Sequence, residues 1–233
     1  MSLRAQGNAI DTWVFDLDNT LYPPDCDLFA QIDVRMTHYV SSLLQVEPLE
    51  ARRVQKAYYA EYGTTLAGLM ALHAVDPHDF LHHVHDIDVS VVDPDPELHA
   101  LVRALTGKTL VVTNGSRAHA DRVVTQLRLE GLFDDHFDIV AAGFAPKPKR
   151  EAFDRLLEAH AFAPARAMMF EDLARNLEPA AAMGFTTVLV RSGKDWSHEP
   201  EGARPAGLED QPAHVHHVTD CLKGFLRGMA PRS

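Results

Sequence analysis

The chain has 233 residues, 46% of them hydrophobic and 24% charged, which is typical of a globular protein with one large domain or a core carrying an inserted unit. The formal net charge of −11 argues against a general nucleic-acid-binding protein, because such proteins need a basic surface. No apolar run approaches the roughly 20 residues of a membrane span, residues 1–8 do not resemble a secretory signal and the two cysteines lack disulfide spacing, so we expect a reduced cytoplasmic protein without a membrane or nucleic-acid-polymer partner.

The first predicted strand, over residues 10–17, ends in a pair of carboxylates. The apolar run Trp13-Val14-Phe15 leads into Asp16 and Asp18, which share a face in an extended segment. In an open parallel sheet this carboxyl edge is where ligands bind. Two carboxylates so close repel each other unless a cation lies between them or one holds a proton. The pair therefore predicts a metal site or a general acid beside a nucleophile, against the alternative of a turn whose acids cap backbone groups.

A purely helical block follows the first strand. Apolar residues at three- and four-residue intervals predict four helices, around residues 28–43, 48–59, 66–72 and 80–84. No strand is predicted among them. We therefore interpret residues 22–92 as an inserted helical cap over the sheet edge, between two parts of one core, residues 1–21 and 93–233.

Strands and helices alternate after the turn-forming Asp93-Pro94-Asp95-Pro96. Helices are predicted over residues 97–106, 117–129, 149–161 and 174–183, and strands over residues 109–113, 137–141, 167–170 and 186–190. This alternation predicts an α/β fold in which a Rossmann-like parallel sheet is flanked by helices. A loop over residues 192–212, a short edge strand over residues 214–218 and a last helix complete the chain. The edge strand explains the histidine cluster there better than a metal site does.

Three further patches place polar groups at or near predicted strand ends. Thr113-Asn114 offers a hydroxyl and backbone N–H groups that can bind phosphate oxygens or cap the next helix. Glu171-Asp172 offers oxygen ligands for magnesium, or acids that favour a helix N-terminus. Lys147, between two prolines, lies on a stiff loop and can neutralise an anion. The competing Lys149 begins a helix and is expected to point to solvent.

These patches, in this order, resemble the four motifs of the haloacid dehalogenase superfamily of phosphotransferases. The matching residues are Asp16-x-Asp18-x-Thr20, Thr113, Lys147 and Glu171-Asp172. The helical block resembles the C1-type α-helical cap of that superfamily. Within it the chain looks most like bacterial pyrimidine 5′-nucleotidases, on the stretches 15–22, 62–66, 85–88, 113–119 and 170–177.

The resemblance implies a magnesium-dependent phosphomonoester hydrolase. Asp16 would attack phosphorus and form an aspartyl-phosphate. Asp18 would protonate the leaving alcohol and then deprotonate water, its burial near other carboxylates helping to keep a proton available. Mg²⁺ would be held by Asp16, the Asp18 backbone carbonyl and Asp172, with Glu171 acting directly or through water.

The resemblance also assigns the surrounding residues. Those expected at the phosphoryl oxygens are Thr113, Lys147, Asn114 and Thr20. Asn176 would orient Glu171, Asp172 or a metal-bound water. The cap segment Tyr62, Gly63, Thr64 and Thr65 is expected to read the substrate, against the alternative that Thr64 or Thr65 caps a helix.

The implied substrate is a small phosphate ester, with UMP and CMP favoured. Phosphoglycolate, a sugar phosphate, a β-phosphoglucomutase-like mutase activity and a non-catalytic binding protein stay as alternatives. A haloacid dehalogenase is disfavoured, since the dehalogenases that this chain resembles lack an acid at the position of Asp18. The protein is expected to be a monomer or a homodimer.

Overall fold

One parallel sheet forms the centre of the molecule, seen in a computed structural model that describes residues 9–197, 199–200 and 204–229. Residues 1–8, expected to carry no signal segment, and residues 198 and 201–203 of the expected loop lie outside the described part. Within the described residues, the sheet has six strands in the order β3-β2-β1-β4-β5-β6, and every neighbouring pair is parallel. The strands are β1 (Thr12–Phe15), β2 (Lys108–Val112), β3 (Asp135–Phe137), β4 (Ala167–Glu171), β5 (Thr186–Val190) and β6 (His217–Thr219). The predicted Rossmann-like α/β fold is confirmed.

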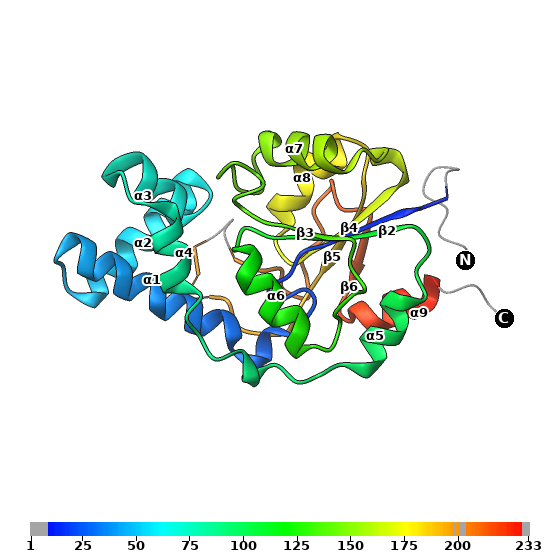
Figure 1. Cartoon of the computed structure of the whole chain (residues 1–233), viewed down its shortest axis with the longest axis horizontal. Helices are drawn as coiled ribbons and strands as arrows, with labels where there is room; N and C mark the ends of the chain where they lie inside the picture. The colour runs from blue at the N-terminus through cyan, green and yellow to red at the C-terminus, as the bar shows by residue number, and fades with distance from the viewer. Residues whose placement is uncertain (1–8, 198, 201–203, 230–233) are drawn as a thin grey trace.

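Helices cover both faces of this sheet, as strands that are buried on both faces require. In β1, Trp13 and Phe15 pack into one apolar cluster and Val14 into the cluster on the opposite face. Figure 1 shows α7 and α8 on one side of the sheet and α5, α6 and α9 on the other. These helices are α5 (Pro96–Arg103), α6 (Arg117–Gln126), α7 (Arg150–His160), α8 (Ala174–Ala182) and α9 (Leu222–Met229).

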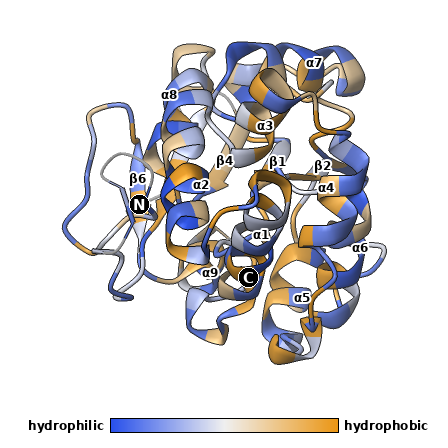
Figure 2. Cartoon of the chain, turned by 90° about the vertical axis from the view of Figure 1, so that its left-hand side faces the viewer, coloured by the Kyte–Doolittle hydropathy of each residue, from blue (hydrophilic) through white to orange (hydrophobic). Residues whose placement is uncertain are grey.

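Four helices between β1 and α5 stand beyond the carboxyl ends of the strands, where Figure 1 shows them as a separate group. They are α1 (Leu28–Leu44), α2 (Pro48–Tyr62), α3 (Thr65–His73) and α4 (Pro77–Val84). Pro48 and Pro77 begin two of them, at the position where a missing N–H costs nothing. Gly63 ends α2 with a φ of 91°, a conformation that glycine adopts without strain. Figure 2 views the molecule from the side on which these four helices lie, and there α1 and α2 carry apolar residues beside polar ones.

Two predicted strands differ most from their bounds in the structure. β3 ends at Phe137 rather than at residue 141, because the Asp138 carboxylate accepts hydrogen bonds from Arg117 N at 2.8 Å and Ala141 N at 2.9 Å and turns the chain. β6 begins at His217 rather than at residue 214. The His216 ring bonds to Thr187 instead, with Nδ1 2.7 Å from the hydroxyl oxygen.

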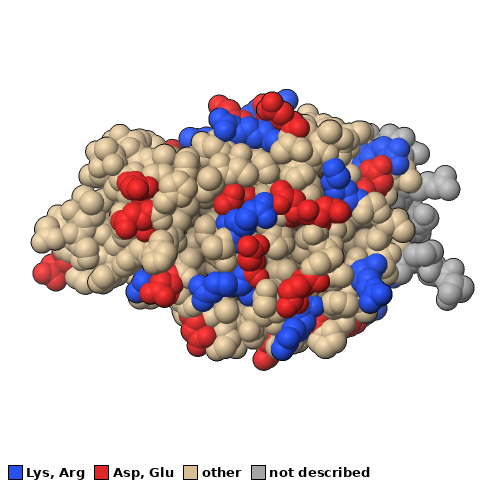
Figure 3. All heavy atoms as spheres, viewed as in Figure 1, with Lys and Arg blue, Asp and Glu red and all other residues tan. Residues whose placement is uncertain are grey.

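The surface carries charges of both signs. On the face shown in Figure 3, acidic and basic side chains are interspersed rather than gathered into a basic patch. Among the described residues, no helix combines the length and the apolar character that crossing a membrane would demand.

Candidate active site

Three adjacent strands deliver polar side chains to the same edge of the sheet. β1 is followed by Asp16, β2 by Thr113, and β4 ends at Glu171, with Asp172 next. The Asp16 N–H continues the ladder by donating to Phe170 O at 2.9 Å, so its side chain is placed by the sheet itself. Between β1 and β4 the chain order reverses, and such a switch point leaves a crevice at the carboxyl ends of the strands.

Lys147 links two of these acids. Its Nζ donates to Asp16 Oδ1 at 2.6 Å, to Glu171 Oε1 at 2.8 Å and to Val112 O at 2.7 Å. The side chain is 3% exposed. Burial acts to lower the pKa of this ammonium, but attraction by the two carboxylates outweighs it and raises the pKa above its usual value. Lys147 therefore lies at the floor of the site with its ammonium favoured by the two carboxylates that it contacts.

An acidic cluster surrounds this lysine. One ligand atom from each of Asp16, Glu171 and Asp172 lies within 4.8 Å of the others, and all three residues are buried. Burial and repulsion by Glu171 raise the pKa of Asp16 to about 7, and burial with the same neighbour raises the pKa of Asp172 well above its usual value. Three carboxylates against one ammonium leave an excess negative charge. A divalent cation fits this donor set, because carboxylate oxygens are hard ligands and the excess charge needs neutralising.

The three carboxylates differ in how many oxygens other groups occupy. Glu171 accepts at Oε1 from Lys147 and from Asn176 Nδ2 at 2.7 Å, and at Oε2 from Leu173 N at 2.8 Å. Asp172 accepts at Oδ2 from Asn19 Nδ2 at 3.3 Å. Asp16 and Asp172 thus have more free acceptor capacity for a cation than Glu171, whose oxygens are held by the protein.

Thr113 and Asn114, which were both expected to bind phosphate, make different contacts in the structure. Thr113 lines the cavity, and its hydroxyl oxygen accepts from Gly115 N at 2.9 Å, which leaves the hydroxyl proton to donate. The Asn114 amide pairs with the backbone of Lys147 at both ends, at 2.8 and 3.0 Å. Its side chain therefore holds the loop that carries Lys147, and Asn114 lines the cavity as well.

Thr20 differs from its expected place. It is 4% exposed, its hydroxyl has no hydrogen-bond partner among the described residues, and it does not line the cavity. The turn that carries Asp18 points Asn19 into the site instead, with a φ of 62°. The expectation that the Thr20 side chain binds phosphate is not supported by this geometry.

Asp18 is held by two partners on one oxygen. Its Oδ1 accepts from the Tyr22 hydroxyl at 2.6 Å and lies 2.9 Å from His119 Nε2. Burial acts to raise the pKa of Asp18, but the interactions with His119 and Tyr22 outweigh burial and lower it. The sequence did not reveal these two partners, which oppose the expected effect of burial on the Asp18 pKa.

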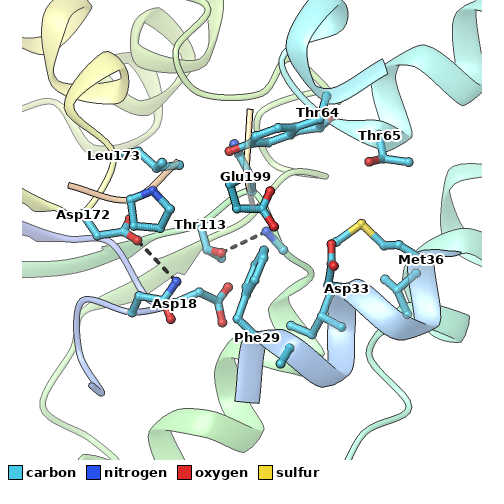
Figure 4. Close-up of a pocket in the computed structure, with 18 of the residues that line it drawn as sticks. Asp18, Phe29, Asp33, Met36, Thr64, Thr65, Thr113, Asp172, Leu173 and Glu199 are labelled. Atoms are coloured by element: carbon cyan, nitrogen blue, oxygen red, sulfur yellow. Dashed lines mark hydrogen bonds between the residues drawn. The ribbon is translucent and has the colours of Figure 1, made fainter. Parts of the chain in front are cut away.

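A cavity of about 440 Å³ opens above these residues. Its far walls come from the helical group, and Figure 4 shows Phe29, Asp33 and Met36 projecting from α1 opposite Asp18, Thr113 and Asp172. Its volume lies within the range of small-molecule sites.

Only half of the segment expected to contact the substrate, residues 62–65, lines the cavity. Thr64 and Thr65 line the cavity, whereas Tyr62 and Gly63 do not, and Tyr59, one turn earlier on α2, takes their place. The Thr64 hydroxyl accepts from Ala67 N at 3.1 Å and so caps α3, as the alternative reading had it.

Side chains from outside the helical group contact it at two places. Arg175, at the start of α8, donates to Gly63 O at 3.2 Å and lies 4.4 Å from the centre of the Tyr59 ring. Lys56 on α2 bonds to Asp33 at 2.7 Å and to Glu199 at 2.7 Å, the latter from the segment after β5. The helical group is thereby held over the carboxylates.

Sequence reasoning had not assigned site roles to several of these residues. The unassigned set is Asn19, Tyr22, Asp33, Lys56, Tyr59, His119 and Glu199. One signal was present: Tyr22 follows Asp18 by four residues within the motif. His119 lies 101 residues from Asp18 in the chain, so only the folded structure brings them together.

Comparison with known proteins places this arrangement in a family. A sequence model described as "haloacid dehalogenase-like hydrolase" matches residues 10–184. The chain is 29% identical over 205 residues to "Phosphate metabolism protein 8" of Saccharomyces cerevisiae, a match that covers 80% of this chain and 63% of the yeast protein. Among solved structures, a HAD phosphatase from Thermococcus onnurineus superposes with a TM-score of 0.62 at 16% identity, over 94% of this chain and 97% of that one. The L-2-haloacid dehalogenase of Xanthobacter autotrophicus superposes with a TM-score of 0.58 at 16% identity, over 96% and 100% of the two chains, and likenesses of this kind show the fold alone.

Proposed function

The chain belongs to the haloacid dehalogenase-like hydrolase family, and we propose that it is a magnesium-dependent phosphatase that works through an aspartyl-phosphate and prefers pyrimidine nucleoside 5′-monophosphates. The observation that carries the proposal is the buried cluster of Asp16, Lys147, Glu171 and Asp172 at the floor of a cavity that Asp18 also lines. The yeast relative, which is named for phosphate metabolism, and the Thermococcus HAD phosphatase agree with it.

In the proposed reaction an Asp16 oxygen attacks phosphorus as the bond from phosphorus to the leaving oxygen breaks. Lys147, beside Asp16, and the Thr113 hydroxyl stabilise negative charge on the phosphoryl oxygens. Asp18 gives its proton to the leaving alcohol, and in the second step it takes a proton from the water that attacks the aspartyl-phosphate. Burial acts to raise the pKa of Asp18 and the contacts with His119 and Tyr22 lower it, and a phosphate dianion beside it raises that pKa by repulsion.

Magnesium would be held by Asp16 and Asp172, with Glu171 near them, and supplies positive charge to the phosphoryl group. Glu171 itself keeps Lys147 and Asn176 in place through its three hydrogen bonds. The Asp18 backbone carbonyl is a further proposed ligand.

Residues 22–92 are proposed to act as a cap, and residues 1–21 and 93–233 as the catalytic core. The cap closes the cavity and excludes water from the aspartyl-phosphate until the leaving group has departed. The aromatic rings of Phe29 and Tyr59 in the cavity wall offer faces on which a nucleobase can stack, and Thr64 and Thr65 lie beside them. These residues support the nucleotide proposal.

The test is phosphate release from a panel of esters, with magnesium and with EDTA. The panel contains UMP, CMP, dTMP, AMP, GMP, phosphoglycolate and glucose phosphates, and products are identified so that a mutase is detected as well. Magnesium-dependent release selective for UMP and CMP supports both the reaction and the substrate class. Preference for phosphoglycolate or a sugar phosphate would keep the reaction and remove the nucleotidase proposal.

Replacing Asp172 with Asn is expected to weaken magnesium binding, because the cation would lose a charged ligand. The magnesium concentration that half-saturates phosphate release should rise at least roughly tenfold. A second measurement does not depend on activity: the rise in melting temperature that magnesium causes in the unmodified chain should need correspondingly more magnesium in the variant. Asp154→Asn, at an exposed acid on α7, is the matched control. An unchanged magnesium titration in the Asp172 variant would remove this residue from the metal site.

A further inference from the structure

Both hydrogen bonds to the Asp18 carboxylate fall on the same oxygen. Oδ1 is 2.6 Å from the Tyr22 hydroxyl and 2.9 Å from His119 Nε2. Among the described residues, Oδ2 has no hydrogen-bond partner, and Asp18 lines the cavity. A carboxylate held in this way cannot rotate about its Cβ–Cγ bond without losing two hydrogen bonds.

We propose that His119 is a positioning residue that, together with Tyr22, fixes Asp18 Oδ1 so that Oδ2 is presented to the leaving oxygen of the substrate. The inference rests on the proposed phosphatase reaction and adds to it a residue that the four motifs do not contain. His119 transfers no proton in this role. It determines which oxygen of Asp18 does so and where that oxygen lies.

The burial of His119 argues that this contact is the reason for a polar side chain at its position. The His119 side chain is fully buried, and its Nδ1 has no hydrogen-bond partner among the described residues. Burying an imidazole with one nitrogen unpaired is unfavourable, so a residue needed only for packing would be better replaced by an apolar one. The hydrogen bond from the ring to Asp18 is the interaction that explains a histidine at this position.

A second histidine keeps the His119 ring in place. His85 stacks on it with ring centres 4.4 Å apart and planes 8° apart. His85 lies just after α4, and it is itself fixed by the Ser116 hydroxyl, 3.0 Å from Nδ1, and by Arg122, which donates to its backbone oxygen at 2.7 Å. The segment that leads from the helical group back to the sheet therefore packs directly on the residue that positions Asp18.

Two variants separate the hydrogen bond from the packing. His119→Phe keeps an aromatic ring for the stack and removes the donor, whereas His119→Gln keeps an N–H donor and removes the ring. The readout is kcat/KM on two kinds of ester: the best alkyl phosphate of the panel, whose alkoxide needs a proton to leave, and p-nitrophenyl phosphate, whose phenolate leaves without one. Because kcat/KM reports the steps up to the departure of the leaving group, it isolates the contribution of Asp18 as an acid.

His119→Phe is expected to lower kcat/KM for the alkyl ester by roughly ten- to a hundredfold, part of the effect of a general acid, and to change the value for p-nitrophenyl phosphate by less than about threefold. His119→Gln should recover much of the loss. The control is His136→Phe, since His136 pairs with a surface carboxylate, Asp121, at 2.6 Å and lies outside the cavity lining. Should His119→Phe fail to fold, Tyr22→Phe removes the other donor and is read by the same contrast between esters.

Equal losses on both esters, or no loss on either, would overturn the positioning role while leaving the phosphatase proposal intact. A failure of the phosphatase proposal is distinct, because the unmodified chain would then release no phosphate from any ester. If His119→Gln lost as much activity on the alkyl ester as His119→Phe, an N–H donor at this position would not restore the rate, which also contradicts the proposal.

Discussion

Replacing Asp16 with Asn is expected to abolish turnover, lowering phosphate release at least about a thousandfold, as is usual when a nucleophile is removed. An amide cannot form the acyl-phosphate, while it keeps the shape of the side chain and an oxygen that can accept the 2.6 Å bond from Lys147. The melting temperature should therefore change little. After an acid quench, phosphate from a labelled substrate should remain covalently bound to the unmodified chain and be absent from the variant.

Asp154→Asn serves as the matched control for Asp16→Asn, since it makes the same chemical change at an exposed acid. It should leave the rate and the covalent label unchanged. If Asp16→Asn hydrolysed substrate at a near-normal rate, Asp16 would not be the nucleophile, and the neighbouring carboxylates would have to be considered in its place.

The positions of Asp16 and Glu171 could be predicted from the sequence, because the ends of buried strands can be located in it. An apolar run that stops at Asp16 or at Glu171 marks the carboxyl end of a buried strand, and parallel strands bring their carboxyl ends to one edge. Thr113 follows from the same argument. Lys147 lies on a loop, so its place beside Asp16 could be expected only from the resemblance, and its hydrogen bonds appear only in the structure.

The sequence did not predict which side chains of the site point into the cavity. Nothing in the motif distinguishes the buried Thr20 from the cavity-facing Asn19, because a single positive φ at residue 19 decides which of them points inward. The Asn114 amide likewise serves the backbone of Lys147, 33 residues away. His119 was hardest to foresee, since it lies 101 residues from Asp18 and only the fold brings the two together.

Replacing Lys147 with Met is expected to damage both stability and activity. The lysine is 3% exposed and bridges Asp16 and Glu171, so its removal leaves buried carboxylates without their protein counter-charge. Loss of one partner of a buried ion pair typically costs about 3–5 kcal/mol of unfolding free energy. Phosphate release should fall at least roughly a hundredfold, because in the proposed reaction the phosphoryl oxygens lose the positive charge of the Lys147 ammonium.

The stability loss in the Lys147 variant should depend on pH in a defined direction. In the folded chain the pKa of Asp16 is about 7, raised from 3.8 by burial and by Glu171. A group with a raised folded-state pKa contributes stability that is complete below its unfolded pKa and is lost as the pH rises through the folded value. Lys147 lowers the pKa of Asp16, so its removal raises that pKa further and widens the window. Urea unfolding in EDTA should therefore show a larger difference between variant and unmodified chain at pH 8 than at pH 5.

Lys149 provides the control for this argument, because it lies two residues from Lys147 and is exposed to solvent at the start of α7. Lys149→Met removes the same charge from the same loop and should leave both the unfolding free energy and phosphate release nearly unchanged. Equal effects of the two substitutions would mean that the loop, and not the buried ammonium, matters. A Lys147 deficit that was the same at both pH values would show that the neighbouring carboxyl groups are not what the lysine compensates. The protonation of Asp16 and the ammonium of Lys147 are alternative ways of neutralising one buried charge, and the proposed reaction requires the ammonium, because it leaves Asp16 ionised and able to attack phosphorus.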